Sequence, residues 1–414
     1  MQEQEQRQEQ KQRQKQMATT ESISDLGGAS PVRSGFAMLV VLPPLADEQL
    51  EGMADRLTSI FPADELLVAT QNGVQAGAFA PLRMVEVPPT RVGWTLTAGD
   101  YANAAELARK HEARSVLMVG PEGGGLSADA LRALAWPAAS GSVDLALPYY
   151  DVPPGAGLMN SAILYPVTRA LFATRARFPL SIDMGLSPRM AERLGAAGQR
   201  LCGLGQDDAI IWPTPEAVAA GFSLGEYDVG PRALPQPPDP DIRTILAHVT
   251  SSLFSEVEAK AAFWQRPRRL PPPRPIAPRR AAPVDRSSEV ASMVDGFRLA
   301  YTNLLEIWSL VLPPASLLGL KRLTVQEPNA FRMPENLWAR IVYDFLIAFR
   351  MRTINRGHLM GTLIPLYLAW VASHINVTNS GMDPERHVEA VAAAFDADKP
   401  YLVSRWRWPD RFNP

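Results

Sequence analysis

A glycine-rich turn is the segment of this sequence best suited to hold an anion. Residues 120–125 read GPEGGG, directly after the apolar run SVLMV and directly before the helical pattern LSADALRAL. Consecutive glycine amides can form a nest for a diphosphate, and a helix that begins there adds its positive end. A glycine-rich connection between a strand and a helix is also common as a plain turn. The sequence leaves both interpretations open.

Several common enzyme signatures are absent from the sequence. The five histidines, at positions 111, 248, 358, 374 and 387, have no spacing that would chelate zinc. The sequence contains no Gly-x-x-x-x-Gly-Lys-Ser/Thr loop, no Gly-x-Gly-x-x-Gly after the first apolar run and no Gly-x-Ser-x-Gly elbow. These absences argue against zinc enzymes, P-loop ATPases and kinases, dehydrogenases and α/β-hydrolases.

Composition indicates a globular protein of more than one domain. The chain has 414 residues, of which 46% are hydrophobic and 20% charged, and its formal net charge is -2. This length predicts two domains plus flexible segments, and the low net charge predicts no attraction to nucleic acid or anionic membranes. A single cysteine, Cys202, indicates a reducing, cytoplasmic location. The apolar stretches near 36–46 and 361–375 contain proline and are too short to span a bilayer, so we expect no membrane span.

The first half of the chain alternates short apolar runs with helical periodicity. The runs FAMLVVL, ELLVAT, LRMVEV, SVLMVG and VDLALPYY predict buried strands, and residues 46–61, 99–113 and 126–140 predict helices. Buried strands separated by helices favour a mostly parallel, Rossmann-like sheet that is covered on both faces. Such sheets bind ligands at the carboxyl ends of their strands, which is where the glycine-rich turn lies.

Composition shifts divide the chain into five parts. Residues 1–34 form a polar tail that we expect to be disordered, and 35–240 form the α/β domain. A connecting helix follows at 241–265, then a Pro/Arg-rich linker at 266–288 and a helical C-terminal domain at 289–414. The linker is typical of an extended spacer, and a ligand for a proline-recognising module is the alternative.

The central block NSAILYPVTRALFATRARFPLSIDMGLS, at residues 160–187, resembles a stretch of the mannosylglycerate and glucosylglycerate synthase-like glycosyltransferases. The matching residues are Tyr165, Pro166, Thr168, Arg169, Ala170, Leu171, Pro179, Asp183, Gly185 and Ser187. Segments 335–349, 362–373 and 399–406 resemble the helical C-terminal domain of the same family. The resemblance implies an α/β fold of the GT-A type, with a Rossmann-like nucleotide-sugar-binding domain and a mainly helical C-terminal domain.

The same resemblance implies roles for individual residues. Asp183 is expected to be catalytic, with Asp207 or Asp208 supplying a second carboxylate. The residues expected to bind the nucleotide sugar and its diphosphate are Pro43, Gly120, Glu122, Gly123, Gly124 and Arg232. The residues expected to bind the acceptor are Asn160, Arg169, Arg177 and Ser187, because guanidinium groups match carboxylates and phosphates. The alternatives are that Asp183 caps a helix beginning near Pro188 and that both arginines are surface cations.

The metal-binding motif of this family is degenerate here. An Asp-x-Asp motif and a later histidine are expected to hold Mg²⁺ or Mn²⁺ on the donor, but Gly120 and Leu234 stand at two of these positions. Glu122 is the remaining candidate ligand, with a solvated loop carboxylate as its alternative role. We therefore expect any transfer to be slow or independent of metal, with the diphosphate stabilised by Arg232 and the amides of residues 123–125. Changing Gly120 to Asp, Glu122 to Asp and Leu234 to His is expected to introduce manganese-dependent donor binding.

Two functions follow from the resemblance. The first is a glycosyltransferase that moves a hexose from a nucleotide-diphosphate sugar to a small hydroxy acid of the glycerate class. The alternative is a catalytically inactive homologue that binds a nucleotide sugar or another protein. The first apolar run ends in LPPLA, without the polar contact expected to recognise the base, so the donor is not indicated. The sequence also leaves a homo-oligomer open.

Overall fold

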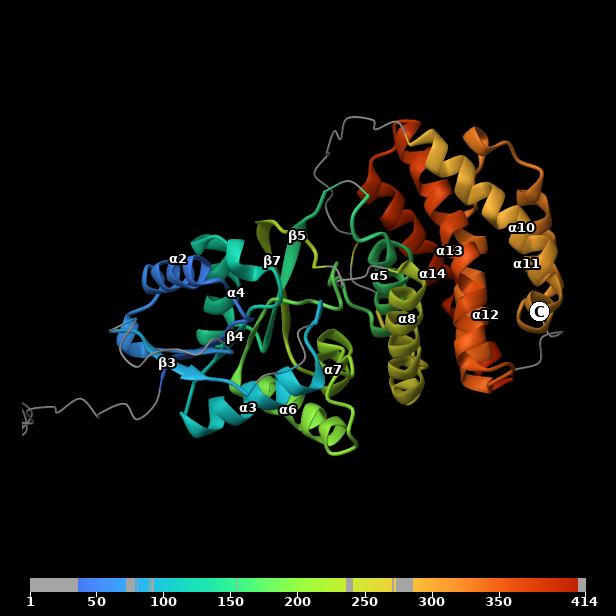
Figure 1. Cartoon of the computed structure of the whole chain (residues 1–414). Helices are drawn as coiled ribbons and strands as arrows, with labels where there is room; N and C mark the ends of the chain where they lie inside the picture. Colours follow the sequence, from blue (N-terminus) through green and yellow to red (C-terminus); the bar gives the residue numbers. More distant parts are fainter. Residues whose placement is uncertain are drawn as a thin grey trace, which may run out of the picture.

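The structure is a computed structural model that describes residues 36–71, 79, 81–88, 90, 93–153, 155–235, 241–269, 272 and 286–408. The predicted polar tail at 1–34 and most of the predicted linker at 266–288 lie outside these ranges. The chain forms an α/β domain and a helical domain that lie side by side (Figure 1).

The α/β domain is built on one sheet with the strand order β3-β2-β1-β4-β6-β5-β7. Its strands are β1 (Met38–Val41), β2 (Leu66–Thr70), β3 (Arg83–Glu86), β4 (Val116–Met118), β5 (Leu145–Asp151), β6 (Met184–Leu186) and β7 (Leu224–Pro231). Neighbouring strands are parallel except at β6, which runs antiparallel to both β4 and β5. The five predicted strands are confirmed. Strands β6 and β7 were not predicted, because β6 has only three residues and the half-buried β7 contains glycine and proline.

Helices cover both faces of this sheet, as predicted. Helices α2 (Asp47–Thr58) and α4 (Ala128–Ala139) lie on one face, and α3 (Ala98–Lys110), α6 (Pro188–Cys202) and α7 (Pro213–Ala220) lie on the other (Figure 1). Met38 and Val40 of β1 point into the core beneath α2 and α4, whereas Leu39 and Val41 point into the core beneath α3 and α6. Because successive strand residues face opposite sides, burial on both faces requires the continuous apolar run MLVV.

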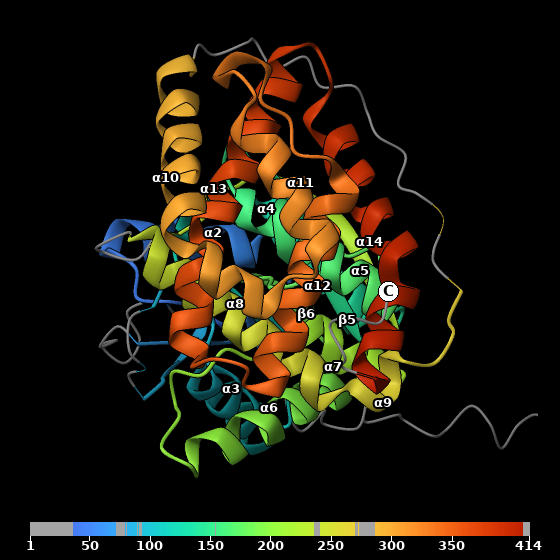
Figure 2. The ribbon, with the colours of Figure 1, turned by 90° about the vertical axis from the view of Figure 1, so that its right-hand side faces the viewer.

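The helical domain surrounds one large core. It contains α8 (Ile242–Ala259), α9 (Ala261–Trp264), α10 (Ser287–Val311), α11 (Pro314–Thr324), α12 (Glu335–Met351), α13 (Arg356–Asn379) and α14 (Pro384–Arg407). Helix α5 (Tyr165–Phe172) of the central block contributes to the same core (Figure 2). The predicted combination of an α/β domain with a mainly helical C-terminal domain is confirmed, and the GT-A type of the α/β domain stays a prediction.

Among the described helices, α13 alone is long and apolar enough to cross a membrane by length and composition. Its best window has a mean hydropathy of 1.2, and 72% of that window is buried inside the protein. Helices α8, α10, α12 and α14 all contact it, so its apolar surface is covered by other helices. The high hydropathy of α13 is therefore explained by its position as a central helix of the core.

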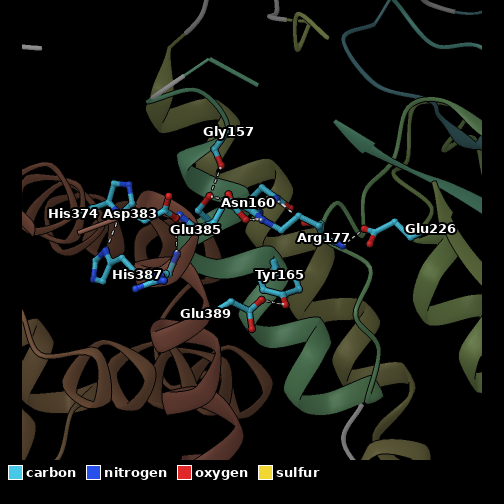
Figure 3. A network of polar contacts seen from close by, with 12 residues as sticks. Gly157, Asn160, Tyr165, Arg177, Glu226, His374, Asp383, Glu385, His387 and Glu389 are labelled. Atoms are coloured by element: carbon cyan, nitrogen blue, oxygen red, sulfur yellow. Dashed lines mark hydrogen bonds and ion pairs between the residues drawn. The ribbon is translucent and has the colours of Figure 1, made fainter. Parts of the chain in front are cut away.

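Ion pairs from α14 hold the central block against the helical domain (Figure 3). Arg177 donates two hydrogen bonds of 2.9 Å to the carboxylate of Glu385. Arg169 pairs with Glu389 and, at 3.1 Å, with Asp396. The indole N–H of Trp338 in α12 donates to the Ala162 carbonyl at 2.8 Å. Because these contacts are largely buried, the two domains are coupled by directional bonds as well as by apolar packing.

Glu385→Ala tests this coupling. The substitution leaves the Arg177 side chain, which is 3% exposed, without its bidentate partner. Breaking one side of a buried ion pair typically costs about 3 kcal/mol, so we expect the free energy of unfolding in urea to fall by that order. Asp129→Asn is the control, because its pair with Arg132 lies on the surface and should contribute less than about 0.5 kcal/mol. Equal effects of the two changes would contradict the coupling role.

A buried histidine pair joins α13 to α14. The Nδ1 atoms of His374 and His387 lie 2.7 Å apart (Figure 3). Both imidazole rings stack with the indole of Trp370. Burial, assisted by the charges of His387 and Arg177, lowers the pKa of His374 from 6.5 to about 3. His374 is therefore neutral in the folded protein at physiological pH.

This shift predicts a loss of stability in mild acid. Between pH 6.5 and 3 the unfolded chain binds a proton at His374 that the folded chain does not, so stability falls as the pH drops through that window. His374→Gln should reduce the decline in unfolding free energy between pH 7 and 5 by about 1–2 kcal/mol. The exposed His248→Gln serves as the control. The same pH dependence in all three proteins would show that His374 is not responsible.

Candidate functional site

Asp183 lies at the centre of a buried polar cluster at the carboxyl edge of the sheet. Its side chain is completely buried and directly precedes β6. Its carboxylate accepts hydrogen bonds from the Gly120 amide at 2.9 Å, the Tyr150 hydroxyl at 2.9 Å and Nε of Arg232 at 3.0 Å. Burial raises the pKa of Tyr150 well above its ordinary value, and the Asp183 charge acts in the same direction, so this hydroxyl is a neutral donor.

Arg232 completes this cluster from the end of β7. Its guanidinium donates to both Asp183 oxygens, to the Pro121 carbonyl at 2.7 Å and to the Ala233 carbonyl at 3.2 Å. The residue is 4% exposed. The ion pair therefore ties together the chain segments that follow β4 and β7 and precede β6. The alternative role of Asp183 as a helix cap is wrong, because Ser187 caps α6 by accepting from the Met190 amide.

A cavity of about 290 Å³ opens at the carboxyl ends of β1, β2 and β4. Pro43 and Glu122, both predicted to bind the donor, lie in its wall. A chain of polar side chains also lines it: Gln71 donates to Thr90 at 2.8 Å, and Thr90 donates to Asp100 at 2.8 Å. The second Asp100 oxygen accepts from the Thr97 amide at 2.8 Å, which fixes its orientation.

Gln71, Thr90 and Asp100 were not predicted as site residues from the sequence. Two signals were available. Gln71 follows a predicted strand directly, and the pattern Thr97-x-x-Asp100 is a capping box at the start of α3. Nothing in the sequence alone showed that the two would share a cavity wall.

The glycine-rich turn is packed more tightly than an open anion nest. Glu122 is exposed in the left-handed region at φ 61°, and it reaches the cavity. Gly123 and Gly124 are buried and do not appear among the described lining residues, and the Gly124 carbonyl accepts from Arg56 at 2.6 Å. Diphosphate binding by the amides of residues 123–125 stays a prediction.

Gly120 is required by packing. A Cβ at this position would lie 2.5 Å from the Ile182 carbonyl oxygen, next to Asp183. The expected restoration of a metal site through Gly120→Asp is therefore incompatible with this packing, because the added side chain would displace the segment that carries Asp183.

The residues present do not fit a divalent metal ion. Within the described ranges, no group of three or more His, Cys, Asp and Glu side chains could hold one. Asp183 already accepts several hydrogen bonds, and the neighbouring Arg232 guanidinium would repel a cation. Glu122 would have to bind the ion with little further help, whereas such ions take several oxygen ligands.

Asp207 and Asp208 are not brought together with Asp183. Both are exposed in the loop between α6 and α7, and neither lines a described cavity near Asp183. The Asp207 carbonyl accepts from the Gly99 amide at 3.0 Å, which fixes this loop against the start of α3. This placement does not support the expected catalytic carboxylate at either position.

A second cavity, of about 470 Å³, lies between the two domains. Tyr150, Ile182 and Leu234 line it from the α/β domain, and Tyr367 and Leu368 line it from α13. Thr95 and Pro235 line both this cavity and the first one, so the two cavities adjoin. The Asp183 cluster lies behind both, because Tyr150 belongs to one wall and Pro121 to the other.

Of the residues expected to bind the acceptor, Asn160 alone lines this interdomain cavity. Its side-chain amide donates to the Arg177 carbonyl at 2.8 Å. Arg169 and Arg177 are paired with acidic residues of α14, as described above. Ser187 caps α6 and donates to Asp144 at 2.9 Å. The arginines are thus buried structural cations, which corrects the alternative that they are surface cations.

Among known proteins, this chain is similar to several solved structures. No protein-family model matches the chain, and no curated protein matches its sequence. Glucosyl-3-phosphoglycerate synthase from Mycobacterium tuberculosis, in complex with Mn²⁺ and UDP-glucose, is similar at 18% identity and a TM-score of 0.35, over 53% of this chain and 78% of that one. The mannosyltransferase PcManGT from Pyrobaculum calidifontis, in complex with GDP-Man and Mn²⁺, is similar at 12% identity and a TM-score of 0.34, over 90% of this chain and 88% of that one. Identities and TM-scores this low do not assign a function to this chain.

Two alanine substitutions test the packing of the turn. Gly120→Ala places a methyl group against the Ile182 carbonyl and should lower the free energy of unfolding by about 1–3 kcal/mol, the usual cost of overpacking. Gly125→Ala is the matched control, because a Cβ there meets nothing within 4 Å, and it should change stability by less than about 0.5 kcal/mol. Urea unfolding measures both. If Gly120→Ala proves as stable as Gly125→Ala, the turn does not depend on this close contact.

Proposed function

We propose that the chain transfers a hexose from a nucleotide-diphosphate sugar to an acceptor hydroxyl without a divalent metal ion. The observation that carries this proposal is the pair of adjoining cavities beside Asp183, one at the carboxyl edge of the sheet and one between the domains. The acceptor oxygen forms a bond to C1 of the sugar while the bond from C1 to the diphosphate oxygen breaks. The hydroxyl proton passes to the leaving diphosphate or to water.

The smaller cavity is proposed to hold the donor. A nucleoside can place ribose hydroxyls or a base N–H against the Asp100 carboxylate, which accepts hydrogen bonds at a fixed orientation. Gln71 and Thr90 extend this polar wall, and Pro43 adds apolar surface to the same cavity. The diphosphate would then lie toward Pro121 and Glu122 in the wall of the smaller cavity, and the sugar toward Thr95 and Pro235, where the two cavities meet.

Arg232 is proposed to act as a positioning residue in place of the missing metal ligands. Its bonds to Asp183 and to the Pro121 carbonyl hold the turn at the cavity wall. The Asp183 carboxylate neutralises this guanidinium, so direct stabilisation of the leaving diphosphate by Arg232 stays a prediction. The positioning role requires no direct contact with the substrate.

A catalytically inactive homologue is the second candidate. Its support is that Asp183, the carboxylate expected to be catalytic, is completely buried and occupied by several donors. In that case the smaller cavity would bind a nucleotide sugar without turnover, or the scaffold would bind another protein. A glycerate-class acceptor, a cytoplasmic location and a homo-oligomer also stay predictions.

Calorimetry with UDP, GDP and their sugar conjugates tests the donor site. We expect binding that is unchanged by manganese or by a chelator, and an affinity that is about tenfold lower in Asp100→Asn, the equivalent of one hydrogen bond. Asp55→Asn, on the exposed side of α2, should bind like the unaltered protein. Binding that requires manganese would overturn the metal-independent proposal. Release of nucleoside diphosphate with an alcohol present separates the active from the inactive candidate.

A further inference from the structure

The interdomain cavity has predominantly apolar walls. Its volume of about 470 Å³ falls in the range of small-molecule sites. Both domains supply its apolar surface, including Leu180, Ile182, Leu234, Ile245, Met293 and Val371. Covering such walls with an apolar body removes nonpolar area from water, which is the main favourable contribution to binding at a site of this kind.

The described walls of the cavity carry little positive charge that could balance the charge of an anionic ligand. Among its described lining residues, the acidic and basic side chains are Glu289 and Arg286, which pair with each other at 2.7 Å. They are 53% and 28% exposed, so their pair lies at the solvent side of the cavity. Arg169 and Arg177 hold acidic residues of α14 across the domain interface. Burying a carboxylate or phosphate without a cation is unfavourable, so a glycerate-like acceptor fits these walls poorly.

One polar atom at the junction of the two cavities lacks a partner. Thr95 lines both cavities and is 7% exposed. Within the described residues, its Oγ1 makes no hydrogen bond. An unsatisfied buried hydroxyl is costly. The Oγ1 atom itself has almost no exposed surface, so a ligand hydroxyl at the junction would satisfy it once the Thr95 side chain rotates toward the cavity.

From these observations, and resting on the proposed transfer reaction, we infer that the acceptor is an uncharged amphipathic alcohol. Its apolar body occupies the interdomain cavity, and its hydroxyl meets Thr95 at the junction, where the donor sugar would lie. This arrangement leaves the acceptor oxygen directed toward the donor cavity and excludes water from the remainder of the molecule.

The test uses the full chain with decanol and farnesol as probes, and decane, glycerate and 3-phosphoglycerate as comparators. Quenching of tryptophan fluorescence reports binding, since Trp94 lines the cavity. We expect both alcohols to bind and the two acids not to bind. Met293→Trp, which fills the cavity from α10, should weaken alcohol binding at least about tenfold. Met351→Trp, at a 48% exposed position on α12, is the control and should leave it unchanged.

Thr95→Val tests the hydroxyl contact. The unaltered protein should favour decanol over decane by about tenfold, the equivalent of one hydrogen bond, and the variant should lose that preference. Its melting temperature should not fall, because valine has a similar shape and removes an unsatisfied group. Tighter binding of the acids than of the alcohols, or equal alcohol binding in Met293→Trp, would overturn the inference. Alcohol binding without any nucleotide-sugar binding would support this ligand class and overturn the transfer reaction.

Discussion

The buried ion pair between Asp183 and Arg232 is the interaction on which the arrangement of the site depends. Four chain segments meet at it: the turn after β4, Tyr150 of β5, the residue before β6 and the residue after β7. A buried pair of this kind persists only where further hydrogen bonds satisfy both charges, and here both partners are so satisfied. Removing either partner would leave an uncompensated charge under the walls of both cavities.

This pair also determines what chemistry the edge of the sheet can support. A site that relied on a divalent ion would need free carboxylate oxygens, but those of Asp183 are directed to internal donors. The Arg232 guanidinium occupies both Asp183 oxygens and takes the place that a metal ion would need. The close packing of Gly120 against Ile182 belongs to the same arrangement, since a larger residue there would displace Asp183.

The domain interface has a comparable effect on the larger cavity. Arg169 and Arg177 pair with acidic residues of α14, so they strengthen the junction between domains and do not appear among the described residues of the interdomain cavity. What remains there is apolar surface with a few polar atoms at the inner end. The coupling of the two domains and the mainly apolar lining of the cavity therefore follow from the same use of buried charge.

Strands β1 to β5, helices α2, α3 and α4 and the helical character of the C-terminal half could be predicted from the sequence, because they depend on local apolar periodicity. The sequence also identified Asp183, Arg232 and the 120–125 turn as neighbours of the site through their place in recognisable segments. The pairing of Asp183 with Arg232, the position of Asp207 and Asp208 outside the cavities, and the position of Asp100 and Thr95 at the cavity walls became visible only in the folded chain. Such outcomes depend on contacts between residues far apart in the chain. Residue type and spacing do not specify which partner a charged side chain finds, because that choice is made by burial and by the geometry of packed elements.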